Sequence, residues 1–472
     1  MRGSEFDDPP EDRFPELADL FRRHPLAYAG YRISHLRHHG RQISESGEIP
    51  FVTSPLFPVV IAGYLLVSRL RYLGRAALGR TASFDVGRSG HVFSMTSTRG
   101  YRTHTFLAVA DALRERGESV VLLCSPAAAD KRDEWAAEGY RTITHRELHG
   151  RVGVLATFRG LVRAFVLVRS LRGTGDTEPG LGNALLYYNF VLLEFVKRES
   201  VRPLTAEDPS VHTFSPMPYL VDATEHERVF VYQHGIQPPL GDKIMAAPFF
   251  APLTYLLWGD PWHTNFRSYV HSGADLRTVG SPWYEHLAEK RRPDRDPSYD
   301  VLFVSGSHDL TDERMERRFE RLVEETVGIC EDQGLSLAVK LHPLEDRAWF
   351  DGRGYGEHVT EFDDIDDALM DSRVAVTNAS TAFVESAVLG VPVVVSDLWE
   401  YGLSTLAPVD YVEFTDGPEV REAVATAVEG EGFRSAESRP LVSLGDSRDD
   451  ILAVVDEKRA SDGNPYRVAS AG

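Results

Sequence analysis

The sequence predicts an α/β protein with two doubly wound halves, each built around a parallel β-sheet. Two observations predict this class: short apolar strands alternate with helices in both halves, and polar residues follow the ends of the strands. In the C-terminal half, an apolar strand at 301–304 precedes an amphipathic helix from about 311 to 333, and another strand covers 336–341. Ligands of such sheets bind outside the carboxyl ends of the strands. The sequence therefore indicates where a site should lie.

The alternation continues through the rest of the C-terminal half. A short acidic helix is expected at 364–372, a strand at 374–376, a helix at 381–389 and a strand at 391–395. Because a helix rather than a tight turn follows each strand, successive strands can run in the same direction. This half is therefore expected to form one parallel sheet.

The N-terminal half shows the same pattern with longer intervals between its elements. The predicted polar loop at 96–104 carries no Gly-x-Gly-x-x-Gly sequence, so it does not indicate dinucleotide binding. The predicted strands are 91–95, 119–124, 229–232, 255–259 and 278–282, and the predicted helices are 105–116 and 183–198.

The length of 472 residues suits two or three domains. Residues 290–299 are rich in Arg, Asp and Pro and form the predicted linker. Residues 1–6 resemble an expression-tag remnant and are left out of the fold prediction. The predicted parts are an N-terminal extension at 1–85, an N-terminal domain at 86–290, a C-terminal domain at 300–430 and a tail at 431–472, for which packing back on the N-terminal domain is one option.

The balance of charged residues restricts the binding partners. The chain holds 51 Lys and Arg against 71 Asp and Glu, a net charge of −20. Such a charge argues against general nucleic-acid binding, which depends on attraction to phosphates. The two cysteines, Cys124 and Cys330, are far apart and match neither a disulfide scaffold nor a metal site. A reducing, cytoplasmic setting is therefore expected.

Two stretches are candidates for contact with a membrane surface. Residues 55–68 are largely apolar, but they number only 14 and include Pro58, so they are too short to span a bilayer as a regular helix. Two interpretations remain open for them: an interfacial helix on anionic lipid, or packing under the N-terminal domain. Residues 152–172 form a basic amphipathic stretch, for which a solvated face is favoured. Peripheral association with the inner face of the cell membrane stays an option.

Polar residues follow three strands of the C-terminal half, and we interpret them as a phosphate or nucleotide site. A helix that begins at Thr381 has unpaired backbone N–H groups and a partial positive charge at its start, and both attract a phosphate oxygen. Lys340 and His342 share one face of their strand, which could place an ammonium group near that oxygen. The predicted donor-binding residues are Ser305, Gly306, Ser307, Lys340, His342, Pro343, Asn378, Ser380, Thr381 and Glu385.

These residues also have structural interpretations that stay open. Ser380 can be simply the N-cap of the following helix, with no role in binding. Lys340 can form a salt bridge with the acidic residues 345–346. Glu385 can accept hydrogen bonds from ribose hydroxyls or act as a capping partner near the helix start.

Several short sequence elements occur in an order that resembles a known family. They are residues 233–235 (Gln-His-Gly), 258–260 (Trp-Gly-Asp), 279–282 (Val-Gly-Ser-Pro), 340–343 (Lys-Leu-His-Pro), 378–381 (Asn-Ala-Ser-Thr) and 385–392. Their order and spacing resemble the family of CDP-glycerol glycerophosphotransferases and capsule polysaccharide transferases, over about 229–397. The resemblance implies the GT-B architecture, in which two Rossmann-like domains face each other across a cleft.

The same resemblance implies a transferase. Members of this family move a sugar or polyol-phosphate group from a nucleotide carrier to a surface polymer or a lipid-linked acceptor, generally without a metal held by an Asp-x-Asp motif. A CDP- or CMP-linked donor is favoured here, a UDP-linked donor stays open, and no cofactor is expected. The family's catalytic His matches His234, and its donor-phosphate groups match His342 with Pro343 and Ser380 with Thr381.

Residues of the N-terminal half supply the expected acceptor side. Histidine titrates near neutral pH, so His234 suits a general base for an acceptor hydroxyl. Gly235 permits a sharp exit of the chain there, although a structural role of His234 in shaping the loop before Pro238 stays open. His104 is the next candidate base. The predicted acceptor or cleft residues are Thr98, Arg99, Gly100, Arg102, Gly235, Gln237, Gly280 and Ser281.

The sequence predicts no metal site, and it leaves two other functional classes open. There is no Asp-x-Asp pair after an apolar strand and no His or Cys cluster with ligand spacing, and the acidic residues 363–367 suit a helix start instead. A UDP-N-acetylglucosamine-type 2-epimerase has a segment similar to 280–285. A non-catalytic nucleotide-sugar binding protein is the other alternative.

Overall fold

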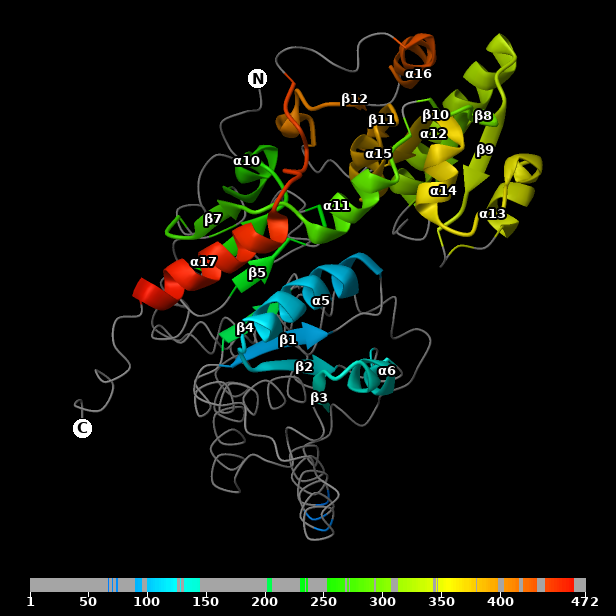
Figure 1. Ribbon diagram of the computed structural model, residues 1–472. Helices are drawn as coiled ribbons and strands as arrows, with labels where there is room; N and C mark the ends of the chain where they lie inside the picture. The colour runs from blue at the N-terminus through cyan, green and yellow to red at the C-terminus, as the bar shows by residue number, and fades with distance from the viewer. Residues whose placement is uncertain are drawn as a thin grey trace, which may run out of the picture.

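The computed structural model places the described elements in two parallel sheets with helices around them (Figure 1). The predicted helix at 183–198, the stretch at 152–172 and nearly all of 55–68 lie outside the described residues. The structure describes residues 67, 70, 74, 90–95, 100–124, 128, 131–144, 202–205, 230–233, 235–236, 253–267, 270, 272–292, 294–306, 313–342, 345, 347–378, 380–397, 403–415, 419–430 and 438–461.

The N-terminal sheet has the strand order β3-β2-β1-β4-β5-β6-β7, and each neighbouring pair is parallel. Its strands are β1 (His91–Met95), β2 (Val120–Cys124), β3 (Arg141–Thr144), β4 (Arg202–Thr205), β5 (Phe230–Tyr232), β6 (Thr254–Leu257) and β7 (Asp275–Thr278). The helices described in this half are α5 (Gly100–Glu115), α6 (Arg132–Ala137), α10 (Pro261–Arg267) and α11 (Pro282–Glu289).

The C-terminal sheet has the order β12-β11-β10-β8-β9 and is also parallel. Its strands are β8 (Tyr299–Val304), β9 (Leu337–Lys340), β10 (Ser372–Asn378), β11 (Val393–Ser396) and β12 (Val412–Thr415). The helices are α12 (Glu313–Gln333), α13 (Ala348–Asp351), α14 (Ile365–Met370), α15 (Ala382–Leu389), α16 (Val420–Glu429) and α17 (Ser447–Ser461), with 3₁₀ turns η6 (Gly356–His358) and η7 (Leu403–Leu406). The predicted class, an α/β protein with two parallel sheets, is confirmed.

Burial explains why the central strands of the C-terminal sheet read as continuous apolar runs. In β10, residues 374–378 are buried without interruption, and β11 is buried along its whole length. A parallel sheet covered on both faces needs apolar side chains on both sides of the strand. The runs of Val in these strands satisfy that requirement.

Two predicted boundaries in the N-terminal half were wrong. The predicted loop at 96–104 is helical from Gly100 onward, because this glycine starts α5 instead of extending the loop. The predicted strand at 278–282 is mostly not a strand. β7 ends at Thr278, and Pro282 begins α11. Proline suits the first helical position because it lacks the N–H group that would be unpaired there.

The predicted linker runs along the C-terminal sheet's elements and is bonded to them. The Lys290 ammonium pairs with Asp366 at the start of α14. Arg291 donates to the hydroxyl of Tyr411, and its guanidinium lies 5.1 Å from the centre of that ring. Ser298 donates from Oγ to Asp371, at 2.7 Å. The linker is therefore attached to the C-terminal half rather than extended between the halves.

The chain crosses back to the N-terminal half near its C-terminal end. The Ser443 backbone N–H donates to the carbonyl of Trp258, at 2.7 Å. A Cβ atom at Gly259 would lie 2.5 Å from the Leu441 carbonyl oxygen, and one at Gly280 would lie 2.3 Å from that of Ser443. These two glycines therefore allow residues 441–447, which we name the crossing segment, to pack on the ends of β6 and β7.

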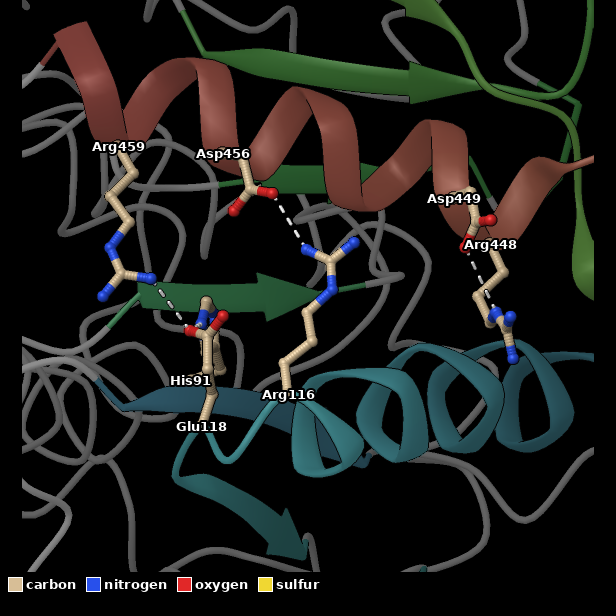
Figure 2. Close-up of polar contacts among 7 residues, drawn as sticks. All are labelled: His91, Arg116, Glu118, Arg448, Asp449, Asp456 and Arg459. Carbon is tan, nitrogen blue, oxygen red and sulfur yellow. Dashed lines mark hydrogen bonds and ion pairs between the residues drawn. The ribbon is translucent and has the colours of Figure 1, made fainter.

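Helix α17 follows the crossing segment and packs on α5 (Figures 1 and 2). Its apolar residues, including Ile451 and Leu452, are buried in the core. Ion pairs join its polar side to the N-terminal half: Arg116 to Asp456 at 2.8 Å, and Arg459 to Glu118 at 3.1 Å. Exposed pairs of this kind each add little stability, so the apolar face supplies most of the attachment and the ion pairs fix its register.

Candidate functional site

Three strands of the C-terminal sheet end side by side in the residues predicted to bind a ligand. β8 lies between β9 and β10, so Ser305, Lys340 and Asn378 all lie at the carboxyl edge. The Ser305 N–H donates to the carbonyl of Lys340 at 2.9 Å, which joins the ends of β8 and β9. The structure thus brings together residues that are up to about 70 positions apart in the chain.

Two polar atoms at the ends of β8 and β10 are buried without a hydrogen-bond partner among the described residues. Ser305 and Asn378 are each only 2% exposed, and neither Ser305 Oγ nor Asn378 Oδ1 has a partner there. Leaving such an atom unpaired costs about 1–3 kcal/mol. Most buried polar groups in proteins are paired, so these two atoms mark the edge as a place where a ligand can contribute hydrogen bonds.

Gly306 allows the chain to approach Asn378 closely. A Cβ atom on Gly306 would lie 2.6 Å from Asn378 Oδ1 and 2.8 Å from Nδ2. Any larger residue would push the Asn378 amide away from its position. The glycine after β8 therefore has a steric reason, and Ser307 lies outside the described residues.

Helix α15 begins next to these strand ends. Ser380 Oγ accepts the Ala382 N–H at 3.3 Å, but the N-cap residue of α15 is Thr381 and not Ser380. Thr381 makes no capping bond with its side chain. The next N–H groups of the first turn are also used within the chain, because those of Phe383 and Val384 donate to the carbonyls of Ser380 and Thr381, at 3.2 and 2.9 Å. The Thr381 side chain and the partial positive charge of the helix start are what remain for a phosphate.

A hydrogen bond between a side chain and the backbone shapes the loop after β9. Glu345 accepts the His342 N–H through Oε2 at 3.0 Å. No ion pair between Lys340 and Glu345 is seen among the described residues, and Pro343 and Asp346 lie outside them. Lys340 ends β9, half-buried, with its charge near the same edge.

Glu385 is a partly buried carboxyl group in the first turn of α15. Burial raises the pKa of Glu385 to about 8, and the nearby charge of Asp366 adds to the effect. At neutral pH this carboxyl group is mostly protonated, so it can donate a hydrogen bond as well as accept one. The sequence suggested only an accepting role.

On the N-terminal side, the structure groups His104 with two aromatic residues that the sequence interpretation missed. The His104 ring stacks on His286 with centroids 5.1 Å apart, and Trp283 meets it edge-on at 5.7 Å. Burial, and then the proximity of His286, lower the pKa of His104, while Glu289 acts in the opposite direction. The i, i+3 spacing of Trp283 and His286 in a helix was the available signal, because it places both on one helix face.

Helix α11 connects the two halves through its packing. It contacts α5 and also α15, and Figure 1 shows it between the two sheets. Trp262 of α10 adds a second junction, because its ring stacks on Phe383 of α15 with centroids 6.3 Å apart. The His104 group and the α15 start are therefore linked through a single helix.

The region of His234 is described on both sides but not at His234 itself. Gln233 is buried, accepts the Trp258 N–H through Oε1 at 3.0 Å and donates through Nε2 to the Gly235 carbonyl at 3.4 Å. Gln233 thus holds this loop against the end of β6. His234, Gln237, Thr98 and Arg99 lie outside the described residues, while Gly100 and Arg102 belong to α5.

The remaining predicted acceptor residues contact the chain itself. Gly280, with φ of +70°, lies against Ser443 of the crossing segment. Ser281 is buried and accepts the Tyr284 N–H as the cap of α11. Glu285 accepts the N–H groups of Gly445 and Ser447, at 3.0 and 2.8 Å. The observed partners of this segment are thus the crossing segment and the start of α11.

Neither a metal site nor a membrane-spanning helix is found in the described part of the chain. It contains no cluster of three or more His, Cys, Asp or Glu side chains arranged to hold a metal ion. None of its helices combines the length and apolar character needed to cross a membrane. Cys124 and Cys330 are both buried and unbridged.

Comparison with known proteins adds only distant structural likenesses. No family model matches the sequence, and no curated protein matches it. The chain is similar to UDP-GlcNAc 2-epimerase from Methanocaldococcus jannaschii in complex with UDP-GlcNAc and UDP, with a TM-score of 0.47, 12% identity, and 78% of this chain and 99% of that chain covered. For UDP-N-acetylglucosamine 2-epimerase from Rickettsia bellii the TM-score is 0.46 and the identity 11%, with 80% of this chain and 99% of that chain covered. For MurG from Acinetobacter baumannii the TM-score is 0.38 and the identity 14%, with 78% of this chain and 99% of that chain covered. The proposed function therefore rests on the strand order and the site geometry of this chain.

Proposed function

We propose that the protein is a transferase that moves a sugar or polyol-phosphate group from a nucleotide-activated donor to a hydroxyl-bearing acceptor. The observation that carries this proposal is the pair of buried, unpartnered polar atoms of Ser305 and Asn378 beside the start of α15, seen among the described residues. Hydroxyl and amide groups beside the positive end of a helix suit the oxygens of a nucleotide's phosphates. The CDP-linked donor and the polymeric or lipid-linked acceptor come from the sequence resemblance.

The transfer step requires a proton acceptor and stabilisation of a leaving phosphate. The acceptor's hydroxyl oxygen forms a bond to the transferred group while the bond from that group to the nucleotide's phosphate breaks. His234 takes the hydroxyl proton. The α15 start, Lys340 and Thr381 stabilise the negative charge that the phosphate gains. Protonated Glu385 supplies a further donor in the first turn of α15.

The test measures nucleotide affinity by calorimetry, using CMP, CDP, UDP and GDP. Ser380→Ala combined with Thr381→Ala should weaken binding of the preferred nucleotide by about tenfold or more, since hydrogen bonds to charged groups are lost. The matched control is Ser298→Ala with Ser336→Ala, which removes two hydroxyls at the amino ends of β8 and β9. Unchanged affinity in the folded double variant, or equal weakening in the control, contradicts the proposal.

Product analysis then separates the open alternatives. A transferase releases the nucleotide only as the group moves to an acceptor or to water. Interconversion of the sugar within an intact or transiently cleaved donor would instead indicate a 2-epimerase. Binding without any turnover of CMP-, CDP-, UDP- or GDP-linked donors would indicate a binding protein.

A further inference from the structure

His104 is held by ring packing rather than by a hydrogen bond to its inner nitrogen. It is the fifth residue of α5, and its ring stacks on His286 at an interplanar angle of 23° with Trp283 edge-on at 68°. The Nδ1 atom is buried and has no partner within the part of the chain that the structure describes. The orientation of the imidazole therefore depends on α11, which supplies both neighbouring rings.

The unpaired Nδ1 decides which neutral form of His104 is favoured. Neutral imidazole carries one proton, on either Nδ1 or Nε2. A proton on Nδ1 would bury an N–H group without an acceptor, and orphaned N–H groups are rarer in proteins than under-satisfied acceptors. The proton therefore belongs on Nε2, the nitrogen that remains available to a ligand.

The surroundings of His104 also oppose the imidazolium form. That form needs protons on both nitrogens, including the buried Nδ1. His286 lies against the ring, and burial and this neighbour together lower the pKa of His104 against the opposite effect of Glu289. The positive end of α5 acts in the same direction as His286. The ion pair of Arg116 with Asp456 of α17 lies at the other end of α5 (Figure 2).

We propose that His104 is a neutral hydrogen-bond donor, through Nε2–H, to an anionic phosphate oxygen of the ligand, and that Trp283 and His286 are its positioning residues. The identity of that oxygen rests on the proposed function. A neutral donor near a helix start suits an anionic oxygen, and α11 joins this position to the start of α15. This role excludes His104 as the general base, because a base needs a free lone pair on Nε2.

The first test needs no ligand and so stands apart from the proposed function. Two-bond ¹H–¹⁵N spectra of ¹⁵N-histidine-labelled protein, assigned with His104→Gln, report the tautomer of each ring. The proton of His104 should reside on Nε2 from neutral to alkaline pH. In His286→Gln, which alters a half-exposed side chain, the titration of His104 should move to higher pH. A proton on Nδ1, or a titration unaffected by His286→Gln, overturns the proposal.

The second test compares two replacements of His104 by their affinity for the preferred nucleotide. Gln places an amide N–H near the position of Nε2–H, so His104→Gln should keep affinity within about threefold of the unchanged protein. His104→Ala should lose about tenfold, the effect of one hydrogen bond to a charged group. Equal loss in both folded variants overturns the donor role. Absence of nucleotide binding by the unchanged protein overturns the proposed function as well, while the tautomer result is unaffected.

Discussion

The carboxyl edges of the two sheets differ in what contacts the residues after the strands. In the N-terminal sheet, the ends of β6 and β7 are packed by the chain itself: Gly259 and Gly280 lie against Leu441 and Ser443. In the C-terminal sheet, Ser305 and Asn378 bury polar atoms that have no partner among the described residues. Buried polar atoms without a described partner also occur beside the N-terminal edge, at Trp258 Nε1 and Ser447 Oγ. The two edges therefore differ in packing: the returning chain contacts the N-terminal edge, and the C-terminal edge is the one that we propose for the ligand.

This difference explains why two glycine-containing motifs that look alike in sequence have different roles. The glycine at 280 is needed because a backbone carbonyl approaches it from the crossing segment. The glycine at 306 is needed because the Asn378 amide approaches it within its own sheet. The residue that contacts the glycine, and not the glycine itself, therefore distinguishes the N-terminal edge, which packs against the crossing segment, from the C-terminal edge, which we propose binds the ligand.

The largest expected effect concerns His234, the proposed base, which follows β5 in the sequence. His234→Ala or His234→Asn should lower the rate of transfer by about 10²-fold or more, because proton removal from the acceptor loses its base. Affinity for the nucleotide should stay nearly unchanged. Steady-state kinetics with separate calorimetry distinguishes the two. Retained transfer, or loss of nucleotide binding alone, would assign His234 to the scaffold or to the donor site.

The anchoring contact should appear as a loss of stability. Gly280→Ala should lower the free energy of unfolding by about 1–3 kcal/mol more than Gly430→Ala, because overpacking against Ser443 adds to the strain of a positive φ. Gly430 is the matched control: its φ is +82°, and a Cβ atom added there would meet no atom within 4 Å. Urea unfolding measures both. Equal losses would mean that the crossing segment yields freely, and the anchoring role would fail.

The stability of the protein should depend on pH through Glu385, in the first turn of α15. The pKa of Glu385 is raised to about 8 from an ordinary value of 4.5. Because the folded form binds this proton more tightly, the contribution to stability is complete below about pH 4.5 and is lost as the pH rises through 8. The unfolding free energy of the unchanged protein should therefore fall relative to Glu385→Gln between about pH 5 and 8. Glu422→Gln, at an acid on the less buried side of α16, should not reproduce the difference.

The smallest expected effect concerns the ion pairs of α17. A double-mutant cycle on Arg116 and Asp456 should give a coupling energy of about 0.2–1 kcal/mol, since both side chains are partly exposed. Added salt should reduce it. The pair of Arg448 and Asp449, which lies within α17, serves as the control for effects on the helix alone (Figure 2). A much larger coupling would show that charge, rather than the buried apolar face, attaches α17.

The sequence predicted the positions of the strand ends and the helix start in the C-terminal sheet better than the contacts of the N-terminal edge, for a physical reason. Strand ends and helix starts are local features, so Asn378 and Thr381 could be placed from their neighbours alone. The contact of Gly280 with Ser443 joins residues more than about 160 positions apart, and nothing local encodes it. Gly280 was therefore interpreted as a cleft residue.

Properties that depend on burial or on packing between helices were not predicted, although Glu385 and His104 themselves were among the predicted site residues. The raised pKa of Glu385 follows from its surroundings in the folded chain. The grouping of His104 with Trp283 and His286 requires α5 and α11 to meet. The start of α5 at Gly100 was missed because glycine usually marks a loop in sequence.

The most direct test of the binding edge is a crystal structure of the protein with a bound nucleoside diphosphate, beginning with CDP. We expect the diphosphate to lie at the carboxyl edge of β8 and β10. Its oxygens should be within hydrogen-bond distance of the Thr381 hydroxyl, at the positive end of α15, with the ligand also pairing Ser305 Oγ or the Asn378 side chain. A diphosphate bound elsewhere, with these polar atoms still unpaired, would contradict the claim that this edge is the donor site.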